Sequence, residues 1–141
     1  MNFRHDDATA GAAVTAIRAE KMPPQVLVVD DSHQIREFVA LLLRLSGYRV
    51  LKAPDGVAAQ EILKTEHPDL VISDLEMPVC DGWDMLAYCH ECHPALPVLI
   101  ISGTSLGRKP EIERWASGFI SKPFNLPQFR SEVQRLLPRA A

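Results

Sequence analysis

The chain has 141 residues, of which 47% are hydrophobic and 23% charged, and its formal net charge is −3. This length is typical of one domain that is large enough to bury a core. The weakly acidic charge argues against non-specific binding of nucleic acids, which needs a basic surface. No apolar run approaches the roughly 18 residues of a membrane span. Met1–Ala10 also lacks the apolar core of a signal peptide. We therefore expect a cytoplasmic protein with no membrane contact, and free thiols at Cys80, Cys89 and Cys92.

Residues 1–24 are expected to form a mobile leader, and residues 25–141 the folded domain. Within the leader, Ala12–Glu20 has helix-forming residues, but a short isolated helix is only marginally stable in water. Met22–Pro24 would end such a helix.

The first half of the expected domain alternates strands with helices. Val26–Val29 predicts a short apolar strand, after which Asp31 or Ser32 caps a helix that ends at Gly47. Tyr48–Lys52 predicts a second strand, which leads into a second helix. The apolar residues that mark these helices are Ile35, Val39, Leu42 and Leu43 in the first, and Val57, Ile62 and Leu63 in the second.

The second half continues the same alternation. Its strands are expected at Leu70–Ser73, Pro97–Ser102 and Gly118–Ser121. Its helices are expected around Met85, Leu86 and Cys89, over Pro110–Ala116, and over Leu126–Leu137. Strands that alternate with helices favour right-handed βαβ units. The predicted fold is therefore a single α/β domain with a five-stranded parallel sheet and helices on both faces.

Polar residues stand where the expected strands end. Asp74 follows the apolar strand Leu70–Ser73, and an ionised carboxylate beside an apolar core needs a cation, hydrogen bonds or a proton. Asp30 and Asp31 follow the first strand. Ligands of open α/β sheets bind at the carboxyl ends of the strands. The matching residues of the fourth and fifth strands are Ser102 and Lys122.

The three carboxylates indicate a metal site. The predicted topology places the strands before Asp31 and Asp74 side by side, and carboxylates at that distance repel each other. A hard divalent cation relieves the repulsion. Mg²⁺ suits carboxylates, a backbone carbonyl, water and a phosphate oxygen, and Glu76 could supply the carbonyl.

Phosphoryl transfer also needs a nucleophile and groups that bind the phosphoryl oxygens. Asp74 supplies a carboxylate nucleophile, Lys122 an ammonium and Ser102 a hydroxyl. Taken singly, each residue is more often structural: an acidic pair caps a helix, an aspartate ends a strand, and a lysine is solvated. Their place at successive strand ends of one sheet favours a pocket that accepts a phosphoryl group.

The sequence resembles the response-regulator receiver domains of two-component signalling over about residues 25–138. The resemblance implies a flavodoxin-like strand order of 2-1-3-4-5. It rests on the following motifs: Val28–Ser32, Asp74–Pro78 with Asp81–Gly82, Ile101–Gly103 and Ser121–Phe124.

The resemblance assigns a role to each residue of the pocket. Asp74 would accept the phosphoryl group, and Asp31, Asp74 and the main chain of Glu76 would hold Mg²⁺, with Asp30 assisting through water. The remaining implied assignments are phosphoryl binding by Ser102 and Lys122, an aromatic switch at Phe119, and a cis peptide bond at Lys122–Pro123, which the proline makes feasible.

The chain departs from the family pattern in two places. Lys122 follows Ser102 by 20 residues, which is shorter than the family spacing. The shortening falls between Gly103 and Trp115, so we expect a shortened fourth helix and an altered output surface. Serine at position 102 replaces the commoner threonine and keeps the hydroxyl.

Four other functions match the sequence less well. Cys89–His93 fits the haem-attachment pattern, but Cys89 falls on an apolar helix stripe. Five consecutive residues also cannot readily supply the four ligands of a zinc site. A flavodoxin would need a hydroxyl-rich phosphate loop after the first strand, where Asp30 and Asp31 would repel a flavin phosphate. A Mg²⁺-dependent phosphatase usually carries its nucleophile after the first strand with a second aspartate two residues on, and position 33 is His33.

The expected function is that of a stand-alone receiver and not of an enzyme. Its phosphoryl donor would be a histidine kinase or a histidine phosphotransfer protein. Its output would be contact with a protein target, phosphate relay or homodimer formation. The alternative is a receiver that only drains phosphate from a kinase.

Overall fold

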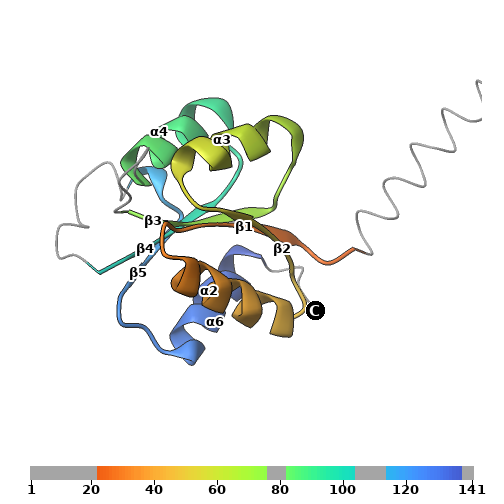
Figure 1. Cartoon of the computed structure of the whole chain (residues 1–141), viewed down its shortest axis with the longest axis vertical. Coiled ribbons are helices and arrows are strands. Elements are labelled where there is room, and N and C mark those ends of the chain that lie inside the picture. The colour runs from red at the N-terminus through yellow and green to blue at the C-terminus, as the bar shows by residue number, and fades with distance from the viewer. Residues whose placement is uncertain (1–21, 76–81, 104–113, 138–141) are drawn as a thin grey trace, which may run out of the picture.

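The computed structural model describes residues 22–75, 82–103 and 114–137. Within these ranges the chain forms three strand–helix pairs, followed by two strands and a last helix (Figure 1). The strands are β1 (Gln25–Val29), β2 (Arg49–Ala53), β3 (Leu70–Asp74), β4 (Val98–Ser102) and β5 (Gly118–Ser121). The helices are α2 (His33–Leu45), α3 (Gly56–Thr65), α4 (Gly82–Cys92) and α6 (Leu126–Leu136).

The five strands form one parallel sheet in the order β2-β1-β3-β4-β5. This order confirms the predicted flavodoxin-like fold. All residues of β3 and β4 are buried, because helices cover both faces of the sheet. In a parallel sheet the strand ends meet at common edges. We call the edge with the last residues of the strands (Val29, Ala53, Asp74, Ser102 and Ser121) the carboxyl edge, and the opposite edge the amino edge.

Two apolar layers hold the helices onto the sheet. Helices α2 and α6 cover one face, and α3 and α4 cover the other (Figure 1). Buried residues of the first layer include Val28, Leu43, Ile72, Ile120 and Phe129. Buried residues of the second layer include Leu27, Leu63, Val71, Met85 and Ile100.

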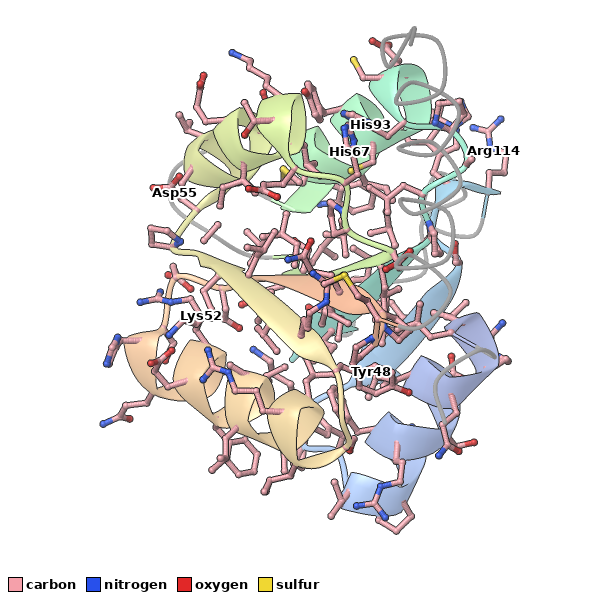
Figure 2. The ribbon with its side chains drawn as sticks, turned by 90° about the vertical axis from the view of Figure 1, so that its right-hand side faces the viewer. Tyr48, Lys52, Asp55, His67, His93 and Arg114 are labelled. Carbon is pink, nitrogen blue, oxygen red and sulfur yellow. The ribbon has the colours of Figure 1, made fainter. Side chains whose placement is uncertain are left out.

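Polar side chains fix where three of the helices begin. Ser32 Oγ accepts a hydrogen bond from the amide of Ile35, which settles the two predicted capping candidates in favour of Ser32. Asp55 caps α3 in the same way, and Figure 2 shows it at the start of that helix. Asn125 caps α6.

The second strand begins one residue later than predicted. The chain turns at Gly47, whose φ is +93°, and the amide of Tyr48 then donates to the carbonyl of Leu43. Tyr48 therefore belongs to the turn that ends α2, because its amide is already used there. The strand runs to Ala53, which pairs with Val29 of β1.

Several predictions fall outside the described residues. They concern most of the leader, the main chain of Glu76, and residues 110–113 of the expected fourth helix. At the end of that expected helix, Arg114 and Trp115 are helical, whereas Ala116 is not. At the end of the expected leader, the carbonyls of Pro23 and Pro24 accept hydrogen bonds from Arg49. No helix in the described ranges is long and apolar enough to cross a membrane.

Candidate functional site

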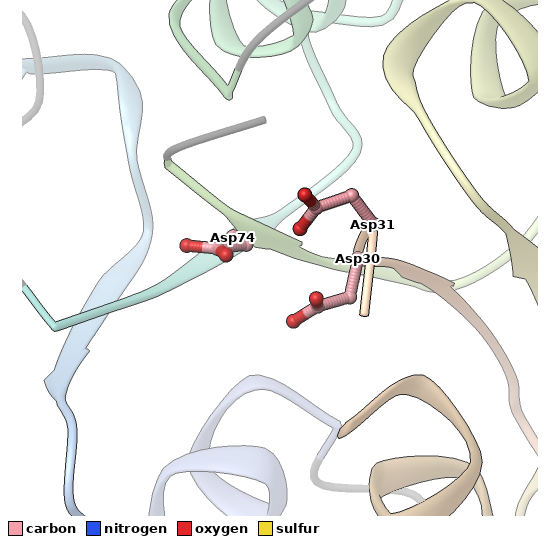
Figure 3. A group of neighbouring side chains, drawn as sticks. All are labelled: Asp30, Asp31 and Asp74. Carbon is pink, nitrogen blue, oxygen red and sulfur yellow. The ribbon is translucent and has the colours of Figure 1, made fainter. Parts of the chain in front are cut away.

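Three carboxylates meet at the carboxyl edge. Asp74 is the last residue of β3, and Asp30 and Asp31 directly follow the neighbouring strand β1. One oxygen of each carboxylate lies within 4.8 Å of those of the other two (Figure 3). The sheet order brings them together, as predicted, because β1 and β3 are adjacent and end at the same edge.

Asp30 is held by bonds to its main chain and its side chain. Its amide donates to the carbonyl of Ala53, 3.2 Å away, so the residue extends the contact between β1 and β2. Its Oδ1 accepts the amide of Ser32 at 2.9 Å. These bonds fix the carboxylate in the turn between β1 and α2.

Lys122 places a cation between two of the carboxylates. It directly follows β5, and its Nζ lies 3.4 Å from Oδ2 of Asp74 and 3.7 Å from Oδ2 of Asp30. Its own amide donates to the carbonyl of Ser102 at 2.8 Å. The Lys122–Pro123 peptide bond is cis. The end of β5 therefore contacts both β4 and the acidic cluster.

Burial makes this cluster electrostatically costly. Asp30 is 6% exposed and Asp74 8% exposed, whereas Asp31 is exposed. Burial raises the pKa of Asp30 above its ordinary value, and the negative charges of Asp74 and Asp31 raise it further. The Ser32 amide and the Lys122 ammonium oppose this shift. The site thus has an excess of negative charge that a further cation would stabilise.

The predicted hydroxyl and aromatic residues lie on β4 and β5. Ser102 is fully buried at the end of β4 and pairs with Ser121 of β5. Phe119 is half-buried and packs against the apolar layer under α3 and α4. The structure thus brings Asp30, Asp31, Asp74 and Lys122 into one cluster, with Ser102 joined to Lys122 through the main chain. Phe119 belongs to the adjoining apolar layer.

Two polar residues at the site were missed in the sequence. Ser73 Oγ donates to the carbonyl of Asp74 at 3.0 Å, and Arg36 Nη1 donates to the carbonyl of Asp30 at 2.8 Å. Ser73 could have been suspected as a polar residue within a buried strand. Arg36 gave no signal beyond its place near the start of a helix that follows two aspartates.

The chemistry of the donors fits a hard divalent cation. All three side chains offer carboxylate oxygens, which are the ligands that Mg²⁺ prefers, and Asp31 leaves one side of the cluster exposed for water or a phosphate oxygen. Within the described part of the chain, no histidine or cysteine joins this cluster, so this donor set does not favour zinc.

Comparison with known proteins gives relatives of one kind. The chain is 36% identical over 119 residues to the probable transcriptional regulator ycf27 of Porphyridium aerugineum. The match covers 82% of this chain and 48% of that protein. It is 31% identical over 122 residues to response regulator MprA of Mycobacterium sp. (strain KMS), covering 85% of this chain and 53% of that protein. The chain thus spans about half the length of the curated relatives it matches.

Solved structures of similar fold cover about four fifths of this chain. Chemotaxis protein CheY4 of Vibrio cholerae has a TM-score of 0.73 and 33% identity, covering 81% of this chain and 98% of that one. The response regulator TrrA of Thermotoga maritima, solved in complex with Mg²⁺ and BeF, has a TM-score of 0.76 and 27% identity, covering 80% and 98%. The family model of the response regulator receiver domain matches residues 26–134. This chain therefore belongs to the response-regulator receiver domain family.

Proposed function

We propose that this chain is a stand-alone receiver of two-component signalling that accepts a phosphoryl group on Asp74 in the cytoplasm. The donor is a histidine kinase or a histidine phosphotransfer protein. The observation that carries the proposal is the cluster of Asp30, Asp31 and Asp74 beside Lys122 at the carboxyl edge.

Each residue of the cluster has a defined task in the transfer. A carboxylate oxygen of Asp74 attacks the phosphorus atom, the bond from phosphorus to the donor nitrogen breaks, and that electron pair leaves with the donor. Lys122 offsets the negative charge of the incoming phosphoryl oxygens, and the hydroxyl of Ser102 binds one of them. Phe119 then responds to the position of Ser102. The carboxylates of Asp31 and Asp74, with the main chain of Glu76, would hold Mg²⁺, and Asp30 would assist through water. When bound, the ion neutralises charge on the phosphoryl oxygens.

The output of the domain is proposed to be protein contact and not catalysis of a separate reaction. Phosphorylation changes the charge at the carboxyl edge, and a partner that prefers one state of the domain shifts the balance between the two states. A pull-down with and without phosphorylation, together with measurement of the oligomeric state, distinguishes an external target from homodimer formation. Equal capture and equal size in both states would indicate a phosphate sink.

Phosphate uptake tests the proposed acceptor directly. The protein is incubated with acetyl phosphate, with and without Mg²⁺, and its intact mass is measured. The parent should gain one phosphoryl group only with Mg²⁺, and Asp74→Asn should gain none. Asp69→Asn is the matched control, because it removes a carboxylate at the amino edge of the same strand, and it should behave as the parent. Uptake by Asp74→Asn, or equal uptake without the metal, would overturn the proposal.

A further inference from the structure

Arg36 contacts the turn that carries two of the three carboxylates. It lies near the start of α2, and its Nη1 donates to the carbonyl of Asp30 at 2.8 Å. Its other terminal nitrogen, Nη2, lies 3.1 Å from Nδ1 of His33. The guanidinium thus joins the first residue of the helix to the acidic turn before it.

The carbonyl of Asp30 needs such a partner because of its place in the fold. The paired residues of β1 end at Val29, which is opposite Ala53 of β2 and Ser73 of β3. Asp30 comes one residue later, where the chain leaves the sheet to enter α2. A buried main-chain carbonyl at such a point costs free energy unless it is hydrogen-bonded. A bond from a guanidinium is stronger than one from a neutral donor.

We propose that Arg36 is a positioning residue for the metal site, which fixes the direction in which Asp31 leaves the turn. The peptide group is planar, so a bond to the carbonyl of Asp30 also orients the amide and Cα of Asp31. The amide of Asp30 is already fixed by Ala53. Because both the amide and the carbonyl of Asp30 are hydrogen-bonded, the Asp31 carboxylate keeps its place beside Asp74.

Metal binding is sensitive to this orientation. Mg²⁺ demands nearly ideal octahedral geometry, so a displaced carboxylate is a poor ligand. Loss of a group that orients a metal ligand typically weakens metal affinity by about 10–100-fold. This inference rests on the proposed function, because it concerns the same Mg²⁺ site.

The two contacts explain why the residue is an arginine. A guanidinium presents several donors in one plane, so Arg36 can contact His33 and the Asp30 carbonyl at once. A lysine has one flexible ammonium and would hold the carbonyl without the same orientation. Arg36→Lys should therefore keep part of the orientation of Asp31, and Arg36→Ala should lose it.

Calorimetric titration with MgCl₂ tests the role of Arg36. Arg36→Ala should weaken Mg²⁺ affinity by about 10–100-fold, and Arg36→Lys should weaken it less. The amide NMR signal of Asp31 should also move in metal-free Arg36→Ala. Arg135→Ala is the matched control, because Arg135 likewise donates to a main-chain carbonyl, that of Ser117, at 2.8 Å. That contact lies at the amino edge, so Mg²⁺ affinity should stay within about twofold of the parent.

The possible outcomes separate the two proposals. If Arg36→Ala and Arg36→Lys both bind Mg²⁺ as the parent does, the positioning role is wrong while the proposed function stands. If Arg135→Ala loses as much affinity as Arg36→Ala, the effect is general destabilisation and the role is again wrong. If Arg36→Ala does not fold, Arg36→Lys and Arg36→Gln decide the matter. A parent that binds no Mg²⁺ overturns both proposals.

Discussion

The two edges of the sheet use aspartate in opposite ways. At the amino edge, Asp69 accepts the amide of Gln25 on Oδ2 at 2.8 Å, and its own amide donates to the carbonyl of Gln25 at 2.7 Å. At the carboxyl edge, Asp30 also accepts a main-chain amide but lies beside two further carboxylates. The first arrangement extends the hydrogen bonding of the sheet. The second gathers like charges that the fold does not need.

Contacts at the amino edge are mainly structural. The amide of Ser117 donates to the carbonyl of Val98, the amide of Val98 donates to Ser117 Oγ, and Arg135 binds the carbonyl of Ser117. A hollow at this edge is lined by Pro68, Asp69 and residues 93–97. The contacts at the amino edge thus complete the hydrogen bonding of the sheet, whereas the carboxyl edge keeps an electrostatic cost that a ligand can relieve. Natural proteins commonly give up stability at functional sites in this way.

Removal of Lys122 should have the largest effect on stability. Lys122→Ala leaves Asp30 and Asp74 buried without their cation, and we expect a loss of about 2 kcal/mol in the free energy of unfolding without Mg²⁺. Because Lys122 is 22% exposed and its contacts are long, the loss should stay below that of a fully buried pair. Urea unfolding at pH 7 measures it, and added Mg²⁺ should restore most of the loss.

Lys52 offers a matched control for that experiment. Figure 2 shows it on the side of the sheet that α2 covers, where it pairs with Glu37 at 2.7 Å. The two side chains are 34% and 39% exposed, so solvent screens the pair. Lys52→Ala should leave stability nearly unchanged, with or without Mg²⁺. Equal losses in the two variants would contradict the contrast between buried and exposed pairs.

Adding a methyl group at each edge, by a glycine-to-alanine substitution, should show which edge is more tightly packed. In Gly118→Ala the new Cβ would lie 2.7 Å from Glu132 Oε2 and 3.0 Å from Cδ1 of Leu99. The glutamate can move, but Leu99 is fully buried, so we expect a loss of about 1–2 kcal/mol from overpacking. Thermal unfolding measures the change.

Gly103, next to the carboxyl edge, is the control position. Among the described residues, a Cβ there would meet only side-chain atoms of Lys122, the nearer at 3.8 Å, which is an ordinary contact. Gly103→Ala should therefore change stability by less than about 0.5 kcal/mol. If Gly103→Ala loses more stability than Gly118→Ala, the amino edge is not the more tightly packed of the two.

The smallest expected effect on stability is a gain, and it comes from removing the charge of Asp30. Because the pKa of Asp30 is raised in the folded state, the folded protein binds this proton more tightly than the unfolded chain, whose value is near 3.8. Stability is therefore lost as pH rises from below 3.8 through the folded pKa. Asp30→Asn keeps an oxygen for the Ser32 amide and should stabilise the metal-free protein by about 1 kcal/mol at pH 7.

Two comparisons sharpen this last prediction. The gain from Asp30→Asn should vanish below pH 3.8, where both states of the parent are protonated, and it should be reversed by Mg²⁺, which stabilises the parent more. Asp69→Asn should give no gain at pH 7, because it weakens a charge-assisted bond to Gln25. Stabilisation by Asp69→Asn as large as that by Asp30→Asn would show that net charge, and not the carboxyl edge, is responsible.

The amino-acid sequence was enough to predict the succession of strands and helices and most of the residues at the carboxyl edge. Apolar runs such as Leu70–Ser73 are short and separated by helical periodicity, so the parallel sheet follows from local pattern. Asp74 and Lys122 were found because a charged residue at the end of an apolar strand conflicts with its surroundings. The start of β2 was misplaced because the bond from Tyr48 to Leu43 depends on how α2 ends.

The partner of each charged side chain depends on the tertiary structure. Asp69 and Asp30 are both aspartates next to an apolar strand. Asp69 completes the hydrogen bonding of the amino edge, whereas Asp30 joins a cluster of carboxylates that repel each other. Arg36 reaches the acidic turn from the helix that directly follows it, whereas Lys122 reaches it from the distant end of β5. Such contacts depend on distances between strand ends and helix starts, which no local pattern specifies. Local sequence sets where the chain can be strand or helix, whereas the electrostatics of the site arise only when the strands are side by side.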